Sequence, residues 1–183
     1  MQATEILMEE HRVIEKVLFS LETAAKRLSA GQMIPMDFFL KAADFIKNFA
    51  DGCHHKKEEG ILFVALAVNG MPQDAGPIAM ILEEHEEGRR LAQAMREVAE
   101  RVQGGDITAL SQVIQNALEY VTLLCEHIQK EDNILFPMAD NVIPIGQHQQ
   151  IVAEFNRIEN EDEIHEKYLR IADELAKAVN GDS

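Results

Sequence analysis

Apolar residues along this chain recur mainly at intervals of three and four, the spacing that places side chains on one face of an α-helix. The first such stripe consists of Leu7, His11, Ile14, Leu18 and Leu21. Glycine and proline interrupt the periodicity in four short stretches, 31–35, 69–77, 104–105 and 137–146. No segment alternates as a half-buried strand would, so the pattern predicts helices joined by short turns.

The turns divide the chain into five predicted helices. Thr4, Asp37 and Asp106 are suitable N-terminal caps for the first, second and fourth helices. Pro137 would interrupt the fourth helix, and a break is expected near Asn160 in the fifth. The predicted ranges are about 4–30, 37–68, 77–104, 106–136 and 147–178.

These elements predict an all-α fold. Four long helices with short connections pack most simply as an up-down-up-down antiparallel four-helix bundle over residues 3–136, with an additional C-terminal helix within 137–180. The length of 183 residues fits a single domain, 1–183, which can bury a core without disulfides. We therefore expect Cys53 and Cys125 to be reduced thiols.

The charge of the chain limits the classes of partner that it can bind. A formal net charge of −15, with lysine and arginine scattered among acids, argues against nucleic acid or an anionic membrane as partner. We expect acidic pairs such as Glu9-Glu10 and Glu83-Glu84 to lie on solvated helix surface. The sequence shows no signal peptide pattern and no apolar stretch long enough to span a bilayer, so we expect a soluble cytoplasmic protein.

Residues 54–63 and 127–136 repeat one short pattern, a histidine followed four residues later by a glutamate and then by Ile-Leu-Phe at the same offset. Residues four apart share a helix face, so His54 with Glu58, and His127 with Glu131, each present an imidazole beside a carboxylate. Two such pairs on facing helices suit iron or manganese. The repetition fits duplication of a helix pair and equally fits convergence on one ligand geometry.

Each predicted bundle helix places at least one histidine on its inward face: His11, His54 or its neighbour His55, His85 and His127. Burying two glutamates in the core without compensating cations would cost several kcal/mol for each carboxylate, because each loses its solvation by water. Bound metal ions would remove that cost. Zinc is a weaker alternative, because five or more candidate ligands exceed a closed tetrahedral site. The remaining alternative is a helical interaction protein whose histidines only hydrogen-bond.

These motifs resemble the hemerythrin-like, or HHE cation-binding, proteins over nearly the full length of the chain. The matching segments are Glu10-His11-Arg12, His54-His55-x-x-Glu58-Glu59, Glu84-His85-Glu86-x-x-Arg89 and His127-x-x-x-Glu131. The resemblance implies a non-heme centre of two iron ions with an additional oxo, hydroxo or water bridge. It implies that Glu58 and Glu131 bridge the irons and that His11, His54, His85 and His127 supply terminal nitrogens.

The chain also departs from the oxygen carriers of this family. Oxygen carriers have a second histidine on the third helix, where this chain has Arg89. On the fourth helix they have an aspartate five residues after the histidine, whereas this chain has Glu131 four residues after His127. These departures argue against reversible dioxygen carriage. His55, His165 or water could replace the missing ligand. We include His165 among the expected ligands because residues 163–168 resemble a segment of longer bacterial members, whereas His148 is expected to be exposed.

The expected function is therefore to bind, sense or detoxify a small oxidant, which would be dioxygen, peroxide or nitric oxide. Two alternatives stay open. One is iron storage or delivery, including repair of iron-sulfur clusters. The other is a diiron peroxidase or oxidase that acts at an open iron position.

Overall fold

The computed structural model describes residues 2–162 and 164–180, with side-chain environments for 2–159 and 165–180. Every regular element in these residues is a helix, which confirms the all-α prediction. Three elements are π-helical (η1, η2 and η4) and one is a 3₁₀ turn (η3). In chain order they are α1 (Ala3–Ser29), α2 (Met36–Phe45), η1 (Ile46–His55), η2 (Glu58–Leu62), α3 (Phe63–Val68), α4 (Gly76–Gln103), η3 (Ile107–Ala109), α5 (Leu110–Lys130), η4 (Glu131–Leu135), α6 (Phe136–Val142), α7 (Ile145–Asp162) and α8 (Ile164–Asn180).

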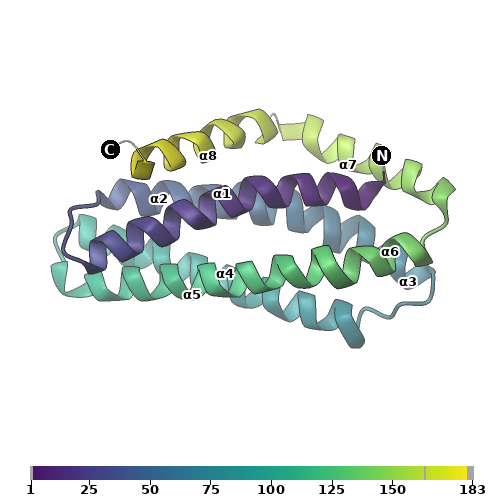
Figure 1. Cartoon of the computed structure of the whole chain (residues 1–183), viewed down its shortest axis with the longest axis horizontal. Helices are drawn as coiled ribbons and strands as arrows, with labels where there is room; N and C mark the ends of the chain where they lie inside the picture. Colours follow the sequence, from purple (N-terminus) through teal and green to yellow (C-terminus); the bar gives the residue numbers. More distant parts are fainter. Residues whose placement is uncertain (1, 163, 181–183) are drawn as a thin grey trace.

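The helices form four long rods that run along the long axis of the molecule (Figure 1). One rod is α1 and another is α4, while α2 to α3 and α5 to α6 each continue as a single rod through their π-helical segments. α4 packs against α5 and α2, and α1 packs against α5. α7 and α8 lie across one side of these rods, where α8 contacts α1 and α2 (Figure 1).

Several helix ends differ from the sequence prediction. Gln2 caps α1 in place of Thr4, whose hydroxyl instead donates a hydrogen bond to Asp140 at 2.7 Å. Pro137 does not end the fourth rod, because η4 places it in the first turn of α6, where a missing N–H is tolerated. The break expected near Asn160 agrees with the structure, in which residues 145–180 form two helices, α7 and α8, on either side of residue 163, which lies outside the described residues.

The apolar core consists of two clusters separated along the rods. The larger cluster fills one half and includes Leu18, Phe45, Leu91, Met95 and Tyr120. The smaller cluster fills the other half and includes Leu7, Leu62, Phe63, Leu135 and Phe136. Buried histidines and glutamates occupy the chain positions between these two sets, so a polar layer crosses the interior of the molecule.

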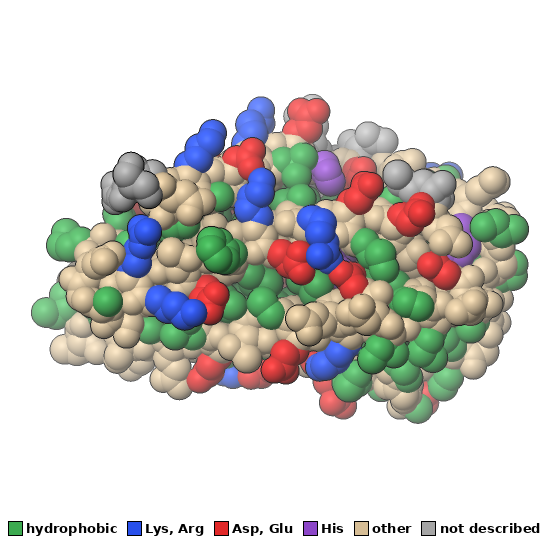
Figure 2. Space-filling view, in the orientation of Figure 1, with side chains coloured by type: hydrophobic (Ala, Val, Ile, Leu, Met, Phe, Trp, Pro, Cys, Tyr) green, Lys and Arg blue, Asp and Glu red, His purple; other side chains and the backbone are tan. Residues whose placement is uncertain are grey.

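Acidic and basic side chains are interspersed over the face of the molecule drawn in Figure 2. This agrees with the scattered charge of the sequence and shows no basic stripe on that face. In the part of the chain that the structure describes, no helix combines the length and the hydropathy needed to cross a bilayer.

Candidate metal centre

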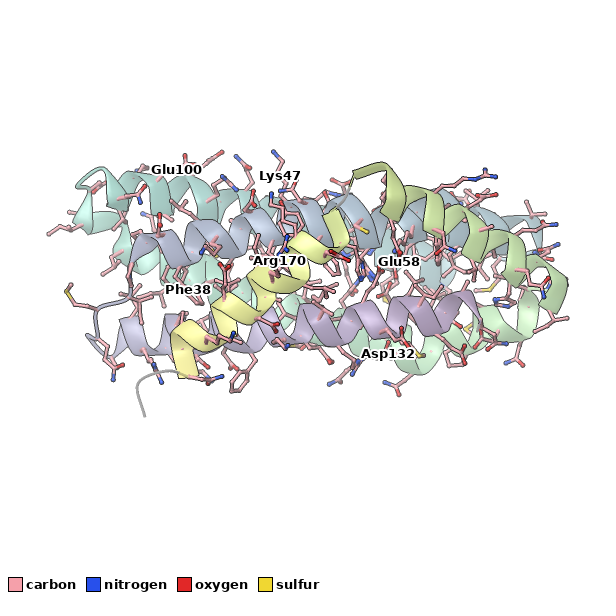
Figure 3. All side chains as sticks on the ribbon, turned by 90° about the horizontal axis from the view of Figure 1, so that it is seen from above. Phe38, Lys47, Glu58, Glu100, Asp132 and Arg170 are labelled. Carbon is pink, nitrogen blue, oxygen red and sulfur yellow. The ribbon has the colours of Figure 1, made fainter. Side chains whose placement is uncertain are left out.

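Two groups of buried side chains meet in the polar layer and share Glu58. In each group the potential ligand atoms lie within 4.8 Å of one another. Glu58 and Asp132 both lie in the half of the molecule that carries α7 (Figure 3). The first group is His11, His54, Glu58 and Glu131, and the second is His55, Glu58, His85 and His127.

The imidazoles point their Nε2 atoms at the two glutamates. His11 and His127 each place Nε2 3.2 Å from Oε2 of Glu131. His54 and His85 each place Nε2 3.4 Å from a different oxygen of Glu58. The Nε2 atoms of His85 and His127 also face one another at 3.2 Å. Four imidazole nitrogens from four rods therefore converge on two carboxylates.

The atoms at the middle of this cluster have no conventional partners. Among the described residues, neither oxygen of Glu58 or Glu131 accepts a hydrogen bond, and Nε2 of His11 and of His54 is also unpaired. A buried polar group without a hydrogen bond costs about 1–3 kcal/mol. Metal ions would use these oxygens and nitrogens as ligands, so the donor set fits a cation of the N/O-preferring class.

The opposite nitrogen of each of these imidazoles is held by a second acidic side chain. Such an outer carboxylate fixes the ring orientation of a metal-binding histidine and makes its Nε2 the ligand atom. The four Nδ1–oxygen distances are 2.6 Å for His11 to Asp132, 2.9 Å for His54 to Glu10, 2.7 Å for His85 to Glu59 and 3.0 Å for His127 to Glu84.

These outer pairs form a closed ring around the four rods. Each rod supplies an acid to the histidine of the next rod: Glu10 of α1 holds His54, and Asp132 of η4 closes the ring on His11. A basic residue from the histidine's own rod contacts each outer acid. The four acid–base pairs are Glu10 with Lys57, Glu59 with Arg89, Glu84 with Lys130 and Asp132 with Arg12.

This ring corrects one expectation from the sequence. Glu10 and Glu84, expected on solvated surface, are buried or nearly so and serve the centre. The sequence does carry a signal for these outer acids, because each one is the neighbour in sequence of a residue of the central cluster. The four adjacent pairs are Glu10-His11, Glu58-Glu59, Glu84-His85 and Glu131-Asp132.

Nearby carboxylates raise the pKa of two histidines of the cluster, which favours their protonated forms when no metal is bound. Burial alone would lower the pKa of His54, but the Glu58 carboxylate and the hydrogen bond to Glu10 raise it to about 10. Burial likewise opposes protonation of His127, whose pKa Glu131 raises to about 9. A divalent metal ion would take the place of these protons, since only neutral imidazole binds metal.

His55 is the ligand candidate that helix periodicity places least well. A step of one residue in an α-helix rotates a side chain about 100°, which would turn His55 away from the face of His54. Both residues instead end a π-helical segment, η1, whose wider turn rotates less per residue, and both are buried. The ring of His55 stacks on that of His85 with centroids 3.8 Å apart.

Arg89 is held outside the cluster by three acids, Asp51 at 2.7 Å, Glu86 at 2.6 Å and Glu59 at 2.5 Å. Arg89 therefore orients the outer carboxylate of Glu59. His55 supplies the third imidazole of the second group. The second group therefore takes one imidazole from each of α4 and α5 and one from the second rod.

Two further histidines lie where the sequence did not place them. His165 is about one third exposed and lies outside both groups that share Glu58, but it forms a separate group of possible metal ligands with Glu10, 4.0 Å from its Nδ1, and Glu159. The structure thus does not bring this expected ligand to the centre. His148, expected to be exposed, is buried, and its Nδ1 accepts a hydrogen bond from the backbone N–H of Ala3 at 3.3 Å.

The two cysteines are free thiols, as expected, but only Cys53 is buried and Cys125 is exposed. Burial raises the pKa of the Cys53 thiol to about 11. Cys53 therefore stays protonated near neutral pH, which does not favour it as a metal ligand.

Together the helical rods and the buried histidine–carboxylate cluster define a cation-binding protein. The chain belongs to the family described as the hemerythrin HHE cation binding domain, which matches residues 2–139. This range contains both groups that share Glu58, whereas the end of α6 and all of α7 and α8 lie beyond it.

Curated relatives extend this result at low identity. The chain is similar to an uncharacterized protein of Mycobacterium tuberculosis (strain H37Rv), Rv1995, with 25% identity over 166 residues, which cover 91% of this chain and 62% of the relative. The chain thus spans about three fifths of that relative's length. The iron-sulfur cluster repair protein YtfE of Salmonella newport is 33% identical over 88 residues, 47% of this chain and 40% of that protein. No solved structure matched the chain.

Proposed function

We propose that this chain is a non-heme diiron protein that binds, senses or detoxifies a small oxidant, namely dioxygen, peroxide or nitric oxide. The observation that carries the proposal is the set of unpaired buried oxygens and nitrogens at Glu58, Glu131, His11 and His54. Five imidazoles and two carboxylates can serve two cations that share Glu58. The proposed fold is a single domain in which an antiparallel four-helix bundle over residues 3–136 holds both ions.

In this proposal His11 and His54 would hold one iron, and His55, His85 and His127 would hold the other. Glu58 and Glu131 would serve both ions, as the family resemblance implies. Two iron ions would supply reversible one-electron redox chemistry next to a small molecule. The two positions differ, since one has two imidazoles and the other has three. The position with fewer nitrogens is the one with room for an added ligand.

The chain's own residues supply orientation and exclude water. The outer acids Glu10, Glu59, Glu84 and Asp132 hold the imidazole rings and keep the protons on Nδ1. Phe136 stacks on His11 with ring centroids 5.4 Å apart, and Phe63 lies parallel to His85 at 6.2 Å. These apolar walls lower the local dielectric and limit solvent access.

The proposal is tested by replacing both shared carboxylates, Glu58→Gln with Glu131→Gln, and measuring iron content after anaerobic loading. The double variant should lose its iron because no carboxylate is left to serve two ions. The matched control replaces two exposed glutamates of α4 and α5, Glu97→Gln with Glu119→Gln, and should retain iron. Full iron occupancy in the Glu58 and Glu131 variant would refute the diiron assignment.

A second candidate is an iron-handling module, including one that repairs iron-sulfur clusters. The similarity to YtfE favours it, because that protein is named for iron-sulfur cluster repair. A delivery protein should release iron to a chelator quickly, whereas a sensor or a peroxidase should retain it through many cycles of oxidation and reduction. A peroxidase or oxidase should in addition turn peroxide over faster than free iron does.

The expected cytoplasmic location remains part of the proposal. It is supported by the small number of cysteines, both of them free thiols. A fusion to a fluorescent protein in the source organism would test it.

A further inference from the structure

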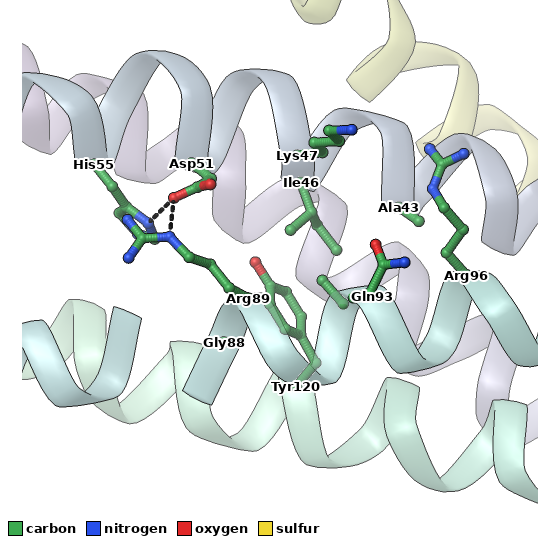
Figure 4. Close-up of a pocket in the computed structure, with 11 residues that line it drawn as sticks. Ala43, Ile46, Lys47, Asp51, His55, Gly88, Arg89, Gln93, Arg96 and Tyr120 are labelled. Atoms are coloured by element: carbon green, nitrogen blue, oxygen red, sulfur yellow. Dashed lines mark hydrogen bonds and ion pairs between the residues drawn. The ribbon is translucent and has the colours of Figure 1, made fainter. Parts of the chain in front are cut away.

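A pocket of about 270 Å³ opens beside the centre between three helical rods. Its wall includes His55 of η1, Arg89 and Gly88 of α4 and Tyr120 of α5. His55 and Asp51 lie at one end and Arg96 at the other (Figure 4). Since a water molecule takes about 30 Å³, the pocket has room for roughly nine non-hydrogen atoms, far more than a diatomic molecule needs.

The wall of the pocket has more basic than acidic side chains, and acids outside the wall pair with both arginines. Its charged side chains are Lys47, Arg89, Arg96 and Asp51, which sum to +2. Arg89 is occupied by its acidic partners. Arg96, in contrast, lies 3.7 Å from Asp44 and 3.9 Å from Glu100, beyond hydrogen-bond distance of both. Its guanidinium is therefore available to hold an anionic group.

The wall between the two ends of the pocket is largely apolar, and its uncharged polar groups are the amide of Gln93 and the hydroxyl of Tyr120. Ala43, Ile46 and Ala92 supply the apolar part of this wall. The hydroxyl of Tyr120 points into the pocket (Figure 4). Tyr120 is 1% exposed, and within the described residues its hydroxyl makes no hydrogen bond. A hydroxyl that faces the pocket can donate a hydrogen bond to an oxygen atom of a ligand.

We propose that this pocket binds a short organic carboxylate that carries a second oxygen at its far end. Arg96 holds the carboxylate, the apolar wall covers the carbon chain, and Tyr120 donates a hydrogen bond to the far oxygen, which lies beside His55. The inference goes beyond oxidant binding because it assigns an organic ligand, and this ligand ends next to an imidazole of the second group.

The test uses the metal-loaded protein and a series of ligands in calorimetric titrations. Affinity should rise about fourfold per methylene from butanoate to hexanoate, and decanoate should gain nothing over hexanoate because the pocket is full. Hexanoate should bind about tenfold more tightly than 1-hexanol, and 6-hydroxyhexanoate about fivefold more tightly than hexanoate.

A separate variant of the protein tests the contact with each part of the proposed ligand. Arg96→Gln should weaken hexanoate at least fivefold and leave 1-hexanol unchanged, whereas the control Arg90→Gln on the exposed face of α4 should change neither. Tyr120→Phe should remove the advantage of 6-hydroxyhexanoate over hexanoate. Ala92→Phe should abolish binding by filling the pocket, with circular dichroism and metal content showing that the fold is retained.

The orientation is tested by paramagnetic broadening in the iron-loaded protein, with the zinc-loaded protein as the diamagnetic reference. Protons at carbon 6 of 6-hydroxyhexanoate should broaden more than those at carbon 2, because the far end lies beside His55. The proposal is overturned if binding is not saturable, if Arg96→Gln or Tyr120→Phe has no effect, or if carbon 2 broadens more. A chain without iron would refute the diiron function but would still bind these carboxylates, so the two failures can be told apart.

Discussion

Replacing Asp132 by asparagine isolates the effect of one outer carboxylate on the metal centre. The change keeps the size of the side chain and an oxygen that can accept from Nδ1 of His11, now 2.6 Å away, but removes the negative charge. A hydrogen bond to a charged acceptor contributes about 1.5–3 kcal/mol and one to a neutral acceptor about 0.5–1.5 kcal/mol. The difference of about 1–1.5 kcal/mol corresponds to roughly a tenfold loss of metal affinity. The side chain of Arg12, 55% exposed, adds little to this loss.

The assay is an anaerobic competition between the protein and a chelator for iron(II), followed by the optical spectrum of the metal. Asp173→Asn is the matched control, because that carboxylate lies on the exposed surface of α8 and, among the described residues, forms an ion pair only with Lys16 of α1. Asp132→Asn should bind iron about tenfold more weakly than the control and the wild type. Equal affinities for Asp132→Asn and Asp173→Asn would show that the ring of outer acids does not support the centre.

Three other perturbations test separate parts of the structure. His55→Ala should lower metal content toward one ion per chain, whereas His165→Ala should leave it unchanged, as metal analysis of the purified variants would show. Metal-free protein should lose stability to urea as the pH rises from about 6.5 to 10, because the pKa values of His54 and His127 are raised in the folded state to about 10 and about 9 and the stabilisation by their protons is then lost. Stability that increases over this range would contradict the assignment of charged histidines. Lys57→Met should lower the free energy of unfolding by about 3–5 kcal/mol, since a fully buried ammonium with two glutamate partners is removed, and a loss below 1 kcal/mol would refute that role.

The features that follow α-helical periodicity were predicted well from the sequence. The spacing of four that joins His54 to Glu58 and His127 to Glu131 places each pair together in the structure. His11 and His85 lie on the inward faces that their apolar stripes indicated. The all-α fold follows from the same periodicity, and the family resemblance is confirmed by the match over residues 2–139.

The features that depend on π-helical geometry could not be predicted from that periodicity. η1 brings His55 to the centre, and η4 lets the fourth rod continue through Pro137 to Val142. Both deviations arise because the wider π-helical turn changes the rotation angle per residue. A prediction based on 3.6 residues per turn does not include this change.

The long-range contacts were also beyond the sequence pattern. The pairing of each outer acid with the histidine of the next rod depends on which helices are neighbours, so the partner of an acid such as Glu84 is not defined until the rods are packed. The positions of His148 and His165 likewise depend on how α7 and α8 lie on α1, which local patterns do not specify.

The most direct test of the diiron assignment is the metal content of protein purified under native conditions, combined with Mössbauer and optical spectra before and after exposure to air and to azide. The account predicts two irons per chain in two distinct environments, one with two imidazoles and one with three. Zinc in place of iron, or no metal after anaerobic iron loading, would contradict it.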